Sequence, residues 1–554
     1  MESTSSPSPP SSSPNEKPDR RLRSRSRPNY SDRRTDSRFW SEFPVQIIVG
    51  SGKVERTYRC IARDISNGGL LIDAPDVPPT ETRLRLHFQV PAGTLPEEFI
   101  HFPMKIGAEV RRRDEKTARM GVKFDEPLSA RLARSTWSLL RGLAMAFFFV
   151  AISLTLFIKY ENYYYFWFDV PVFLYSLLVG AYLLSRFLFA AFYRNPPPRS
   201  DTPPVTLMVP VFNEEKEIGR TLRQVMESDY PADKLQVIVI NDGSTDGSLP
   251  AIHRARERYP ELVLVNFEKS RGKRHALAAA ARMATGDFMV FIDSDSFLKP
   301  DAIRRLLDHF GDPEVAAVTG HCDVENVWTN LLTKMQSVRY YVAFRVMKAA
   351  ESVFDSITCL SGPLAAYRRD RLMEVLDAWE TQKFLGQPAT YGDDRSLTNM
   401  LLRRHHKVRY AEMARCTTVV PDDHRTFLRQ QMRWKRSWFR ESLVACAFMW
   451  QKQPLMAASF YLGFLLPLVA PAIVLRALLV IPLLHSIWPV NYIAGVFVMS
   501  AMLSSVYLLM KRSRLWIYGV VFCFYYMFIL VWQLPIAVLT FARTTWGTRM
   551  TGEI

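Results

Sequence analysis

Five long apolar runs constrain the fold of this chain more than any other feature, because stretches that carry almost no charge must leave water. They span residues 142–158, 170–193, 455–485, 491–510 and 515–541. Each is long enough to cross a bilayer, although Arg186 limits the apolar core of the second run. Pro535 interrupts the last run, so the C-terminal runs predict three or four crossings. A buried hairpin in a soluble protein would explain the first two runs alone, but the later three favour a membrane protein.

The charges beside these runs predict their orientation. Arginine-rich segments 131–141 and 194–199 border the outer ends of the first two runs, and an aromatic loop, 163–168, joins them. Because cationic flanks stay on the cytosolic side, we expect the N-terminus, residue 200 and segment 511–514 in the cytosol. The sequence therefore predicts a multi-pass membrane protein with large cytosolic parts.

The net charge of +17 at pH 7 has three explanations: nucleic acid, anionic lipid headgroups, or phosphorylated ligands held by arginine. The sequence contains no helix-turn-helix signature, zinc-finger spacing or RNA-binding aromatic motif, so we expect no nucleic-acid partner. Arginines next to the apolar runs favour the lipid bilayer as a partner. The six cysteines are scattered and form no CxxC pair, which indicates reduced thiols rather than disulfides or a zinc site.

The chain ahead of the first run divides into a tail and a small domain. Residues 1–33 are rich in Ser, Pro and Arg, have no apolar signal-peptide core, and are expected to form a disordered basic tail. Residues 34–128 contain short alternating runs separated by Gly, Pro and Asp turns, which predicts a small β-barrel. The expected strands are 43–49, 58–62, 70–72, 83–88, 104–110 and 120–124.

Between the membrane segments 129–200 and 441–541, residues 201–440 have a different pattern. Continuous apolar strands alternate there with helix-like segments, which predicts a mostly parallel sheet covered by helices on both faces. The clearest strands are 205–209, 235–240 and 288–292. We therefore expect a cytosolic α/β domain of catalytic type, with residues 542–554 left as a C-terminal segment.

Carboxylates follow two of these strands at positions where ligands gather. Asp242 follows one strand, and Asp293 and Asp295 follow another. Ligands of open α/β sheets bind outside the carboxyl ends of strands, and an Asp-x-Asp there can hold a Mg²⁺ or Mn²⁺ ion that bridges a diphosphate. Arg271 and Lys273 lie between them in a cationic turn suited to phosphate oxygens. An Asp-x-Asp alone is more often surface charge, and an Asp-Gly-Ser is more often a turn. Chance does not readily explain why these motifs and the cationic turn follow one another between buried strands.

Two groups of motifs resemble family 2 glycosyltransferases, over residues 135–554. Similarity to the nucleotide-binding half lies in Pro210-Val-Phe-Asn213-Glu214, Asn241-Asp242, Arg271-Gly-Lys273 and Asp293-Ser-Asp295. Similarity to the processive branch, which includes cellulose, chitin and hyaluronan synthases, lies in Ser361-Gly362-Pro363, Gly392-Asp393-Asp394 and Gln430-Gln-Met-Arg433-Trp434. The resemblance implies a GT-A-type α/β glycosyltransferase domain attached to transmembrane helices.

The resemblance implies a donor site for a UDP-sugar. Asp242 would contact the uracil, and Arg271 with Lys273 would hold the diphosphate. Asp295, aided by Asp293, would bind Mn²⁺ or Mg²⁺. The other residues implied in substrate binding include Asn213, Glu214, Ser361, Gly362, Pro363 and Gln430.

It also implies catalytic and acceptor residues. Asp394, with Asp393 beside it, would supply the general base that takes a proton from the acceptor hydroxyl, giving single displacement with inversion. Arg433 would stabilise charge on the departing UDP, and Trp434 would stack on an acceptor sugar ring. Without the resemblance, Asp393 and Asp394 fit a helix N-terminus, and residues 430–434 fit an amphipathic interfacial helix.

The C-terminal Trp546-Gly-Thr-Arg549 bears on the identity of the donor. It resembles the gating segment of hyaluronan- and chitin-type synthases, although an interfacial Trp with a cationic flank has the same pattern. Cellulose synthases have a different motif there, and Cys-Gly-Ser in place of Ser361-Gly362-Pro363. Both departures favour UDP-N-acetylglucosamine as the donor.

Arg34 and Arg38, followed by Asp64, Ser66 and Gly69, resemble the two motifs of PilZ domains, which bind cyclic-di-GMP. Arginine forks suit phosphates and guanine edges, and the barrel Asp and Ser would complete the pocket. A polybasic membrane-surface patch is the alternative explanation for the arginines. The resemblance implies cyclic-di-GMP as an allosteric activator and a location in a bacterial inner (plasma) membrane. In bacterial cellulose synthases the PilZ domain follows the membrane region, whereas here it precedes it.

Together these features predict a synthase that extends a β-linked polysaccharide and translocates it across the membrane, with envelope export proteins as potential partners. Two alternatives stay open: a non-processive glycosyltransferase with a lipid-linked acceptor, and a catalytically inactive cyclic-di-GMP receptor. The first would not need the motifs 430–434 and 546–549. The second would commonly have lost carboxylates such as Asp295 and Asp394, which are present here.

Overall fold

The computed structural model describes most of the chain beyond the N-terminal tail. The described residues are 38–49, 56–66, 68–74, 83–89, 104–114, 118–126, 128, isolated positions between 142 and 157, 169–389, 391–486 and 488–542. The predicted tail, most of the first apolar run, Arg34, Trp546 and Arg549 lie outside them, and only the backbone of Arg38 is described.

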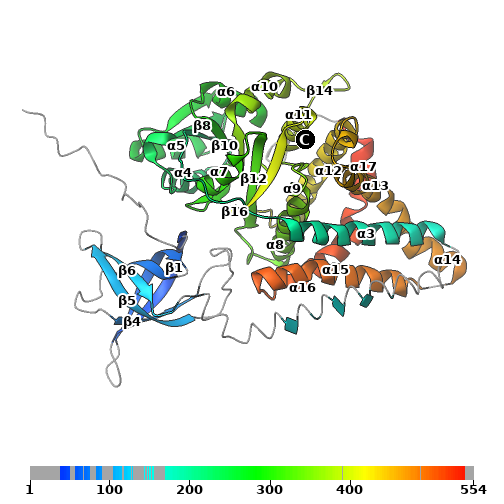
Figure 1. Ribbon diagram of the computed structural model, residues 1–554, viewed down its shortest axis with the longest axis horizontal. Coiled ribbons are helices and arrows are strands. Elements are labelled where there is room, and N and C mark those ends of the chain that lie inside the picture. The colour runs from blue at the N-terminus through cyan, green and yellow to red at the C-terminus, as the bar shows by residue number, and fades with distance from the viewer. Residues whose placement is uncertain are drawn as a thin grey trace, which may run out of the picture. The chain divides into compact units, whose positions relative to one another are not determined.

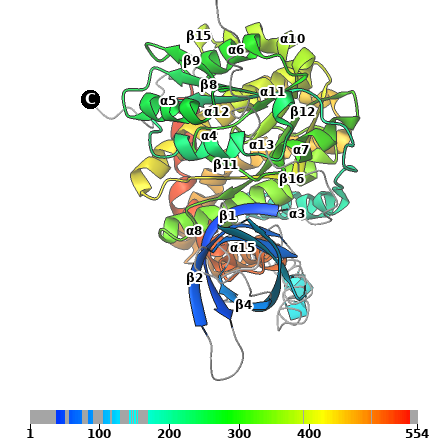
Figure 2. The ribbon, with the colours of Figure 1, turned by 90° about the vertical axis from the view of Figure 1, so that its left-hand side faces the viewer.

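Six antiparallel strands near the N-terminus form a closed barrel with the order β1-β2-β3-β6-β5-β4, which confirms the predicted small β-barrel (Figure 2). The strands are β1 (Arg38–Val49), β2 (Arg56–Ser66), β3 (Gly69–Asp73), β4 (Arg83–Phe88), β5 (Met104–Asp114) and β6 (Arg119–Phe124). Apolar residues alternate inward, as Leu84 and Leu86 do, while Arg85 between them is exposed. The ring of Phe88 lies 5.9 Å from Phe43 and 6.0 Å from Phe124, so one aromatic cluster fills part of the core.

An eight-stranded sheet forms the centre of the α/β domain, in the order β11-β16-β12-β13-β10-β7-β8-β9. Its strands are β7 (Val205–Val211), β8 (Leu235–Asp242), β9 (Val263–Phe267), β10 (Phe288–Phe291), β11 (Ser296–Leu298), β12 (Val315–Val324), β13 (Ala365–Arg368) and β16 (Lys407–Thr418). Strands β10, β7, β8 and β9 pair in parallel, as predicted. The rest is mixed, because β13 is antiparallel to both of its neighbours and β11 is antiparallel to β16.

Helices and a short hairpin surround this sheet (Figure 1). The helices are α4 (Ile218–Met226), α5 (Ser248–Arg258), α6 (Lys273–Met283), α7 (Ala302–Leu307), α8 (Leu331–Val342), α9 (Ala349–Ser352), α10 (Arg369–Glu380), α11 (Asp393–Arg403) and α12 (His424–Cys446), and the hairpin strands are β14 (Lys383–Phe384) and β15 (Gln387–Pro388). Helix α6 packs on β7 and β8, and α7 and α8 pack on β16 and β12. Strand β7 is buried along its whole length, as a strand covered on both faces should be.

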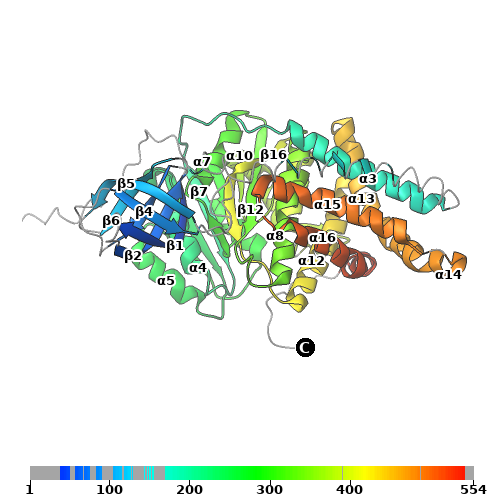
Figure 3. The ribbon, with the colours of Figure 1, turned by 90° about the horizontal axis from the view of Figure 1, so that it is seen from below.

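Long apolar helices make up the remaining described part of the chain. They are α3 (Val170–Phe192), α13 (Pro454–Leu475), α14 (Ile481–His485), α15 (Val490–Lys511), α16 (Trp516–Tyr525) and α17 (Gln533–Leu539). Helices 170–192, 454–485 and 490–511 can each cross a membrane by length and composition, and 516–530 with 533–539 would form a fourth span, bent by 49°. Figures 1 and 3 show α3, α13 and α15 running alongside one another. The protein is therefore a membrane protein.

Arg186, which limits the second apolar run, is buried on α3. Its guanidinium lies 5.1 Å from the ring centre of Tyr182 and 5.2 Å from that of Phe189. At the other end of α3, Asp169 caps the helix and forms an ion pair of 2.8 Å with Arg476 on the α13 side. Arg186 is therefore covered by aromatic rings of its own helix, and the charge of Asp169 is paired between two helices.

Candidate active site

Three neighbouring strands end at one edge of the sheet and gather the residues predicted to bind the donor. Asn213 lies two residues after β7, Asp242 is the last residue of β8, and Asp293 lies two residues after β10. Since β10, β7 and β8 are adjacent and parallel, their carboxyl ends point the same way.

The segment after β7 is fastened to the loop after β8. Asn213 has a left-handed backbone, with φ 54°, and its Oδ1 accepts a 2.8 Å hydrogen bond from the Thr245 backbone N–H. The backbone N–H groups of Asn213 and Glu214 donate to Ser244 Oγ at 3.1 Å and Ser248 Oγ at 2.7 Å. These bonds hold the two loops in one fixed arrangement.

Asp242 holds the cationic turn in place. Its buried carboxylate accepts hydrogen bonds from the backbone N–H of Arg271 at 2.7 Å, from that of Gly272 at 2.9 Å, and from Ser270 Oγ at 2.8 Å. Gly243 has φ 68°, and a Cβ there would lie 2.5 Å from Ser270 N, so only glycine allows this close approach. The structure thus brings Asp242 and the cationic turn together, with the carboxylate oxygens bonded to the turn itself.

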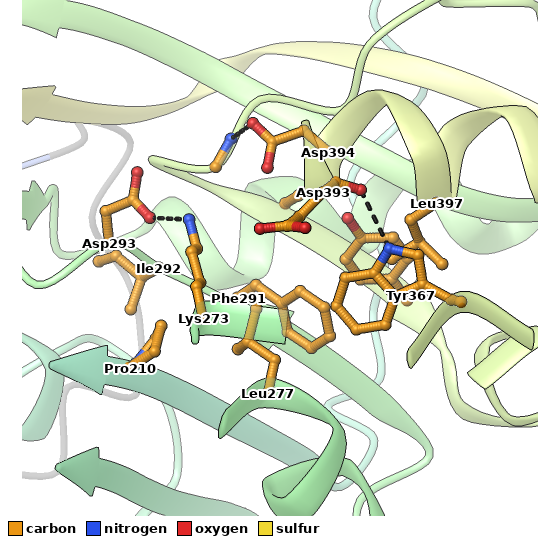
Figure 4. A pocket seen from close by; sticks show the side chains of 13 residues that line it. Pro210, Lys273, Leu277, Phe291, Ile292, Asp293, Tyr367, Asp393, Asp394 and Leu397 are labelled. Carbon is orange, nitrogen blue, oxygen red and sulfur yellow. Dashed lines mark hydrogen bonds and ion pairs between the residues drawn. The ribbon is translucent and has the colours of Figure 1, made fainter. Parts of the chain in front are cut away.

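Lys273, the first residue of α6, forms an ion pair with Asp293 (Figure 4). Burial acts to lower the pKa of Lys273, but the carboxylates of Asp293 and Asp394 outweigh it and raise that pKa above its usual range. A Cβ on Gly362 would lie 2.9 Å from Asp293 Oδ2 and 3.0 Å from Lys273 Nζ. Gly362 therefore lies directly against this ion pair.

The two carboxylates of the Asp-x-Asp differ in environment. Burial, and then the charge of Asp293, raise the pKa of Asp295 to about 7, and Thr418 Oγ1 donates a 3.4 Å hydrogen bond to it. Two close carboxylates make a donor set that suits a hard divalent cation, which would relieve their repulsion. Over the described part of the chain, no group of three or more His, Cys, Asp or Glu side chains is placed to hold a metal ion.

Asp394 comes from a different part of the chain and meets the donor residues through Gly362. Its Oδ2 accepts a 2.9 Å hydrogen bond from the Gly362 backbone N–H (Figure 4). Burial raises the pKa of Asp394 above its usual range, and Lys273 opposes the rise. Gly392 caps α11 with φ 81°, and a Cβ there would lie 2.3 Å from Ser437 Oγ of α12, so this position requires glycine.

Asp393 faces the protein interior, where it pairs with Arg274 and not with Gly362, the partner of Asp394. Its Oδ1 accepts a 2.8 Å hydrogen bond from Arg274 Nε, and both side chains are more than nine-tenths buried. Arg274 also donates to the Trp379 carbonyl at 2.9 Å, and Trp379 Nε1 donates to the Asp393 carbonyl at 3.1 Å. The sequence places Arg274 in the cationic turn expected to meet phosphate oxygens, whereas the structure pairs it with Asp393. Trp379 was not expected in the site.

Helix α12 contributes polar groups that lack partners. Arg433 Nε and Gln430 Oε1 are buried and have no hydrogen-bond partner among the described residues. Burial lowers the pKa of Arg433, while Asp393 and Asp394 act against this. Trp434 packs beside Tyr340, at 6.5 Å between ring centres, and under the Arg339 guanidinium at 5.6 Å. An unpaired buried donor and acceptor are what a polar ligand would satisfy.

Residues from the strand ends and from helices α6 and α11 face a small cavity at the carboxyl ends of the strands (Figure 4). Its walls include Lys273, Asp293, Gly362, Trp379, Asp393 and Asp394. A cation for phosphate oxygens and a carboxylate that can accept a proton therefore share one space, which suits transfer of a group from a phosphate ester to a hydroxyl.

Four of the five predicted cyclic-di-GMP residues, Arg38, Asp64, Ser66 and Gly69, lie on the paired strands β1, β2 and β3. Ser66 pairs in register with Gly69 on one side and with Arg38 on the other. Asp64 and Ser66 are buried, and Ser66 Oγ donates to the Gly69 carbonyl at 3.3 Å. A Cβ on Gly69 would lie 2.1 Å from the Val122 carbonyl oxygen, so the turn requires glycine.

Two family models match the chain. One, described as "PilZ domain", covers residues 32–141, and one, described as "Glycosyltransferase like family 2", covers residues 203–437. A solved mannosyltransferase from Pyrobaculum calidifontis, in complex with GDP-Man and Mn²⁺, has a TM-score of 0.47 and 22% identity over 63% of this chain and 98% of its own. That likeness is too distant to bear on ligands.

Curated relatives match about half of this chain. The chain is 36% identical over 294 residues to an N-acetylglucosaminyltransferase of Rhizobium meliloti (strain 1021), covering 51% of this chain and 68% of the relative. It is 34% identical over 282 residues to a hyaluronan synthase of Streptococcus pyogenes serotype M3, covering 49% of this chain and 66% of the relative. Because two family models match and a relative with 36% identity is covered over 68% of its length, the chain belongs to the family 2 glycosyltransferases and carries a PilZ domain ahead of its catalytic domain.

Proposed function

We propose that the protein is a processive membrane synthase that transfers a sugar from a UDP-sugar to a growing β-linked polysaccharide with inversion. One observation carries the proposal: Gly362 donates a hydrogen bond to Asp394 and lies against the Lys273–Asp293 ion pair. A cation for a diphosphate and a proton acceptor thereby lie around one anomeric carbon, as single displacement requires.

In the proposed reaction the acceptor hydroxyl oxygen attacks the anomeric carbon while the bond from that carbon to UDP breaks. Asp394 takes the hydroxyl proton, and UDP leaves with the bonding electrons. Lys273 and Arg433 stabilise the charge that gathers on the leaving diphosphate. Asp393 is proposed to act through Arg274, by holding the first turn of α11 so that Asp394 keeps its direction.

Asp295, with Asp293, would hold Mn²⁺ or Mg²⁺ in this proposal, and the bound ion would neutralise part of the diphosphate charge. Asp242 would border the uracil while fixing the turn that carries Arg271. Asn213 and Glu214 would shape the nucleotide side through their bonds to the neighbouring loop.

The growing polysaccharide, which is the acceptor, is proposed to leave the active site along α12. Gln430 and Arg433 have buried polar atoms without partners, and Trp434 offers an aromatic face. Ser361, Gly362 and Pro363 would border the reacting sugar. Trp546 and Arg549 are proposed to close over the bound nucleotide.

UDP-N-acetylglucosamine is the proposed donor. Relatives that match about half of this chain are named N-acetylglucosaminyltransferase and hyaluronan synthase. Both names are compatible with a donor that carries N-acetylglucosamine. Ser361-Gly362-Pro363 and residues 546–549 support the same choice over a cellulose-type donor.

Cyclic-di-GMP is proposed as an allosteric activator, held by Arg34, Arg38, Asp64, Ser66 and Gly69. The buried Asp64 and Ser66 at the β2–β3 turn support this assignment. We further propose a location in a bacterial inner (plasma) membrane, with the catalytic and PilZ domains in the cytosol. The polysaccharide would be exported with envelope partners. The proposed domain limits are 1–33, 34–128, 129–200, 201–440, 441–541 and 542–554.

The test is UDP release by purified protein in detergent with Mn²⁺, across a panel of UDP-sugars, with and without cyclic-di-GMP. Release with one or two donors, rising with cyclic-di-GMP and accompanied by polymer, is expected. Arg34→Ala should remove the response to cyclic-di-GMP and leave basal release unchanged. Addition of single sugars to a lipid-linked acceptor would overturn the processive assignment, and release from no donor despite cyclic-di-GMP binding would indicate a receptor.

A further inference from the structure

A buried polar relay crosses the boundary between the membrane helices and the catalytic sheet, and the proposed reaction does not use it. Its members, from one membrane helix to the other, are Tyr193, Tyr410, His321, Asp323 and Lys511. None of the five is more than 8% exposed. Burying polar groups costs free energy unless each is paired, so a set of buried pairs that meet at Tyr410, through its carbonyl on one side and its hydroxyl on the other, is a specific feature of this boundary.

The relay begins at the end of α15. Lys511 Nζ lies 3.0 Å from Asp323 Oδ2 of β12 and 4.9 Å from the ring centre of Tyr341. The other carboxylate oxygen of Asp323 lies 3.3 Å from His321 Nε2. Segment 511–514 reads in sequence as an ordinary cationic flank of a membrane helix, and the exposed Arg514 fits that reading. Lys511 instead enters the catalytic domain.

The relay ends at the exit of α3. His321 Nδ1 lies 2.5 Å from Tyr410 Oη of β16. The Tyr410 carbonyl accepts a 2.8 Å hydrogen bond from Tyr193 Oη, one residue after α3, and Tyr193 Oη also accepts one of 3.2 Å from the Glu412 N–H. Two membrane helices are thus bonded to two adjacent strands of one sheet.

Those strands continue into the candidate active site. Asp323 of β12 is in register with Thr417 of β16, and the next residue, Thr418, donates its hydroxyl to Asp295 at 3.4 Å. Charged pairs and hydrogen bonds hold only at one distance and direction, whereas apolar helix surfaces can slide past each other. The relay therefore defines one position of the sheet against the helices.

We propose that Lys511, Asp323 and Tyr193 are positioning residues that keep the acceptor chain, which leaves toward the membrane helices, aligned with the donor held at the sheet. The inference rests on the proposed function. The strands that carry Asp242 and Asp293, β8 and β10, are not part of the relay, so sugar transfer continues when the relay is loosened. The acceptor end is then lost from the site more often, and the polymer is shorter.

The experiment compares Lys511→Met and Tyr193→Phe with Arg514→Met, which removes an exposed cation from the same loop. UDP release, KM for the UDP-sugar and polymer length are measured for each. For Lys511→Met we expect KM within about twofold, release of at least about half the wild-type rate, and a mean chain length lower by about fivefold or more. Lys511→Arg should recover part of the length, and Arg514→Met should match the wild type.

Unchanged chain length in Lys511→Met would overturn the proposal, as would equal losses of length and release, which indicate a merely structural role. If Lys511→Met does not fold, Tyr193→Phe, which loses one hydroxyl, decides by the same criteria. A wild-type protein that releases UDP without making polymer would instead overturn the proposed processive function, so the two failures are distinguishable.

Discussion

The backbone N–H of Gly362 donates a 2.9 Å hydrogen bond to Asp394 Oδ2, although 32 positions separate them in the sequence. On its other side, a Cβ would lie 2.9 Å from Asp293 Oδ2 and 3.0 Å from Lys273 Nζ. Gly362 thus occupies the point where the proposed base and the proposed diphosphate site meet.

Gly362→Ala should lower kcat/KM for the donor by about 10- to 100-fold, because the added methyl must displace the Lys273–Asp293 pair or the bond to Asp394. UDP release from equal amounts of inserted protein measures this. Gly219→Ala is the matched control, since a Cβ there meets nothing within 4 Å. Wild-type activity in Gly362→Ala would contradict the placement of Gly362 between the proposed base and the proposed diphosphate site.

Asp394→Asn should lower transfer by about 10²- to 10⁴-fold, the usual contribution of a general base, while UDP binding stays nearly intact. Titration calorimetry with UDP, beside the release assay, separates the two. Equal loss of binding and transfer would exclude Asp394 as the base.

The pH dependence of transfer should reflect the environment of Asp394. Burial raises its pKa above the ordinary value of 3.8, so the carboxyl keeps its proton to a higher pH and the base form fills as pH rises. We expect kcat/KM to rise about tenfold per pH unit up to that raised pKa and then to level off. A rate profile that falls with rising pH over the same range would contradict the assignment.

Asp393→Asn should act on stability, because it leaves the buried Arg274 without its counter-charge. Breaking a buried ion pair typically costs about 3–5 kcal/mol of unfolding free energy. Thermal unfolding in detergent measures it. Asp377→Asn breaks the exposed pair with Arg282 and should cost only about 0–1 kcal/mol. Similar effects of the two variants would show that the buried pair is dispensable.

Arg433→Lys should lower kcat by about 10²- to 10³-fold, because lysine keeps the charge but loses the guanidinium geometry that would meet the leaving group. The kcat at saturating donor is the measurement. Arg429→Lys, at an exposed position of the same helix, should leave kcat unchanged. If both variants behave alike, Arg433 does not contact the reacting groups.

Much of the fold follows from local patterns. The barrel strands were predictable because inward and outward residues alternate, as along β4, and the donor residues because carboxylates end buried strands, as Asp242 does. Long-range pairings were not predictable. Asp393 meets Arg274 across 119 positions and Lys511 meets Asp323 across 188, and no local periodicity encodes such partners. For the same reason the sequence predicts only that segment 511–514 is cytosolic, and it does not reveal the contact of Lys511 with Asp323.

The central position of β13 bears on how the protein is synthesised. Although β13 pairs with β10 on one side and β12 on the other, it follows both in the chain. As the chain leaves the ribosome, β7 to β10 can pair at once, whereas β12 has no neighbour in the sheet until β13 is translated. The donor half of the sheet can therefore exist before Asp394 does. A nascent fragment of that length would carry the proposed nucleotide site without Asp394, the proposed proton acceptor, so the two halves of the proposed site would be completed at different times during translation.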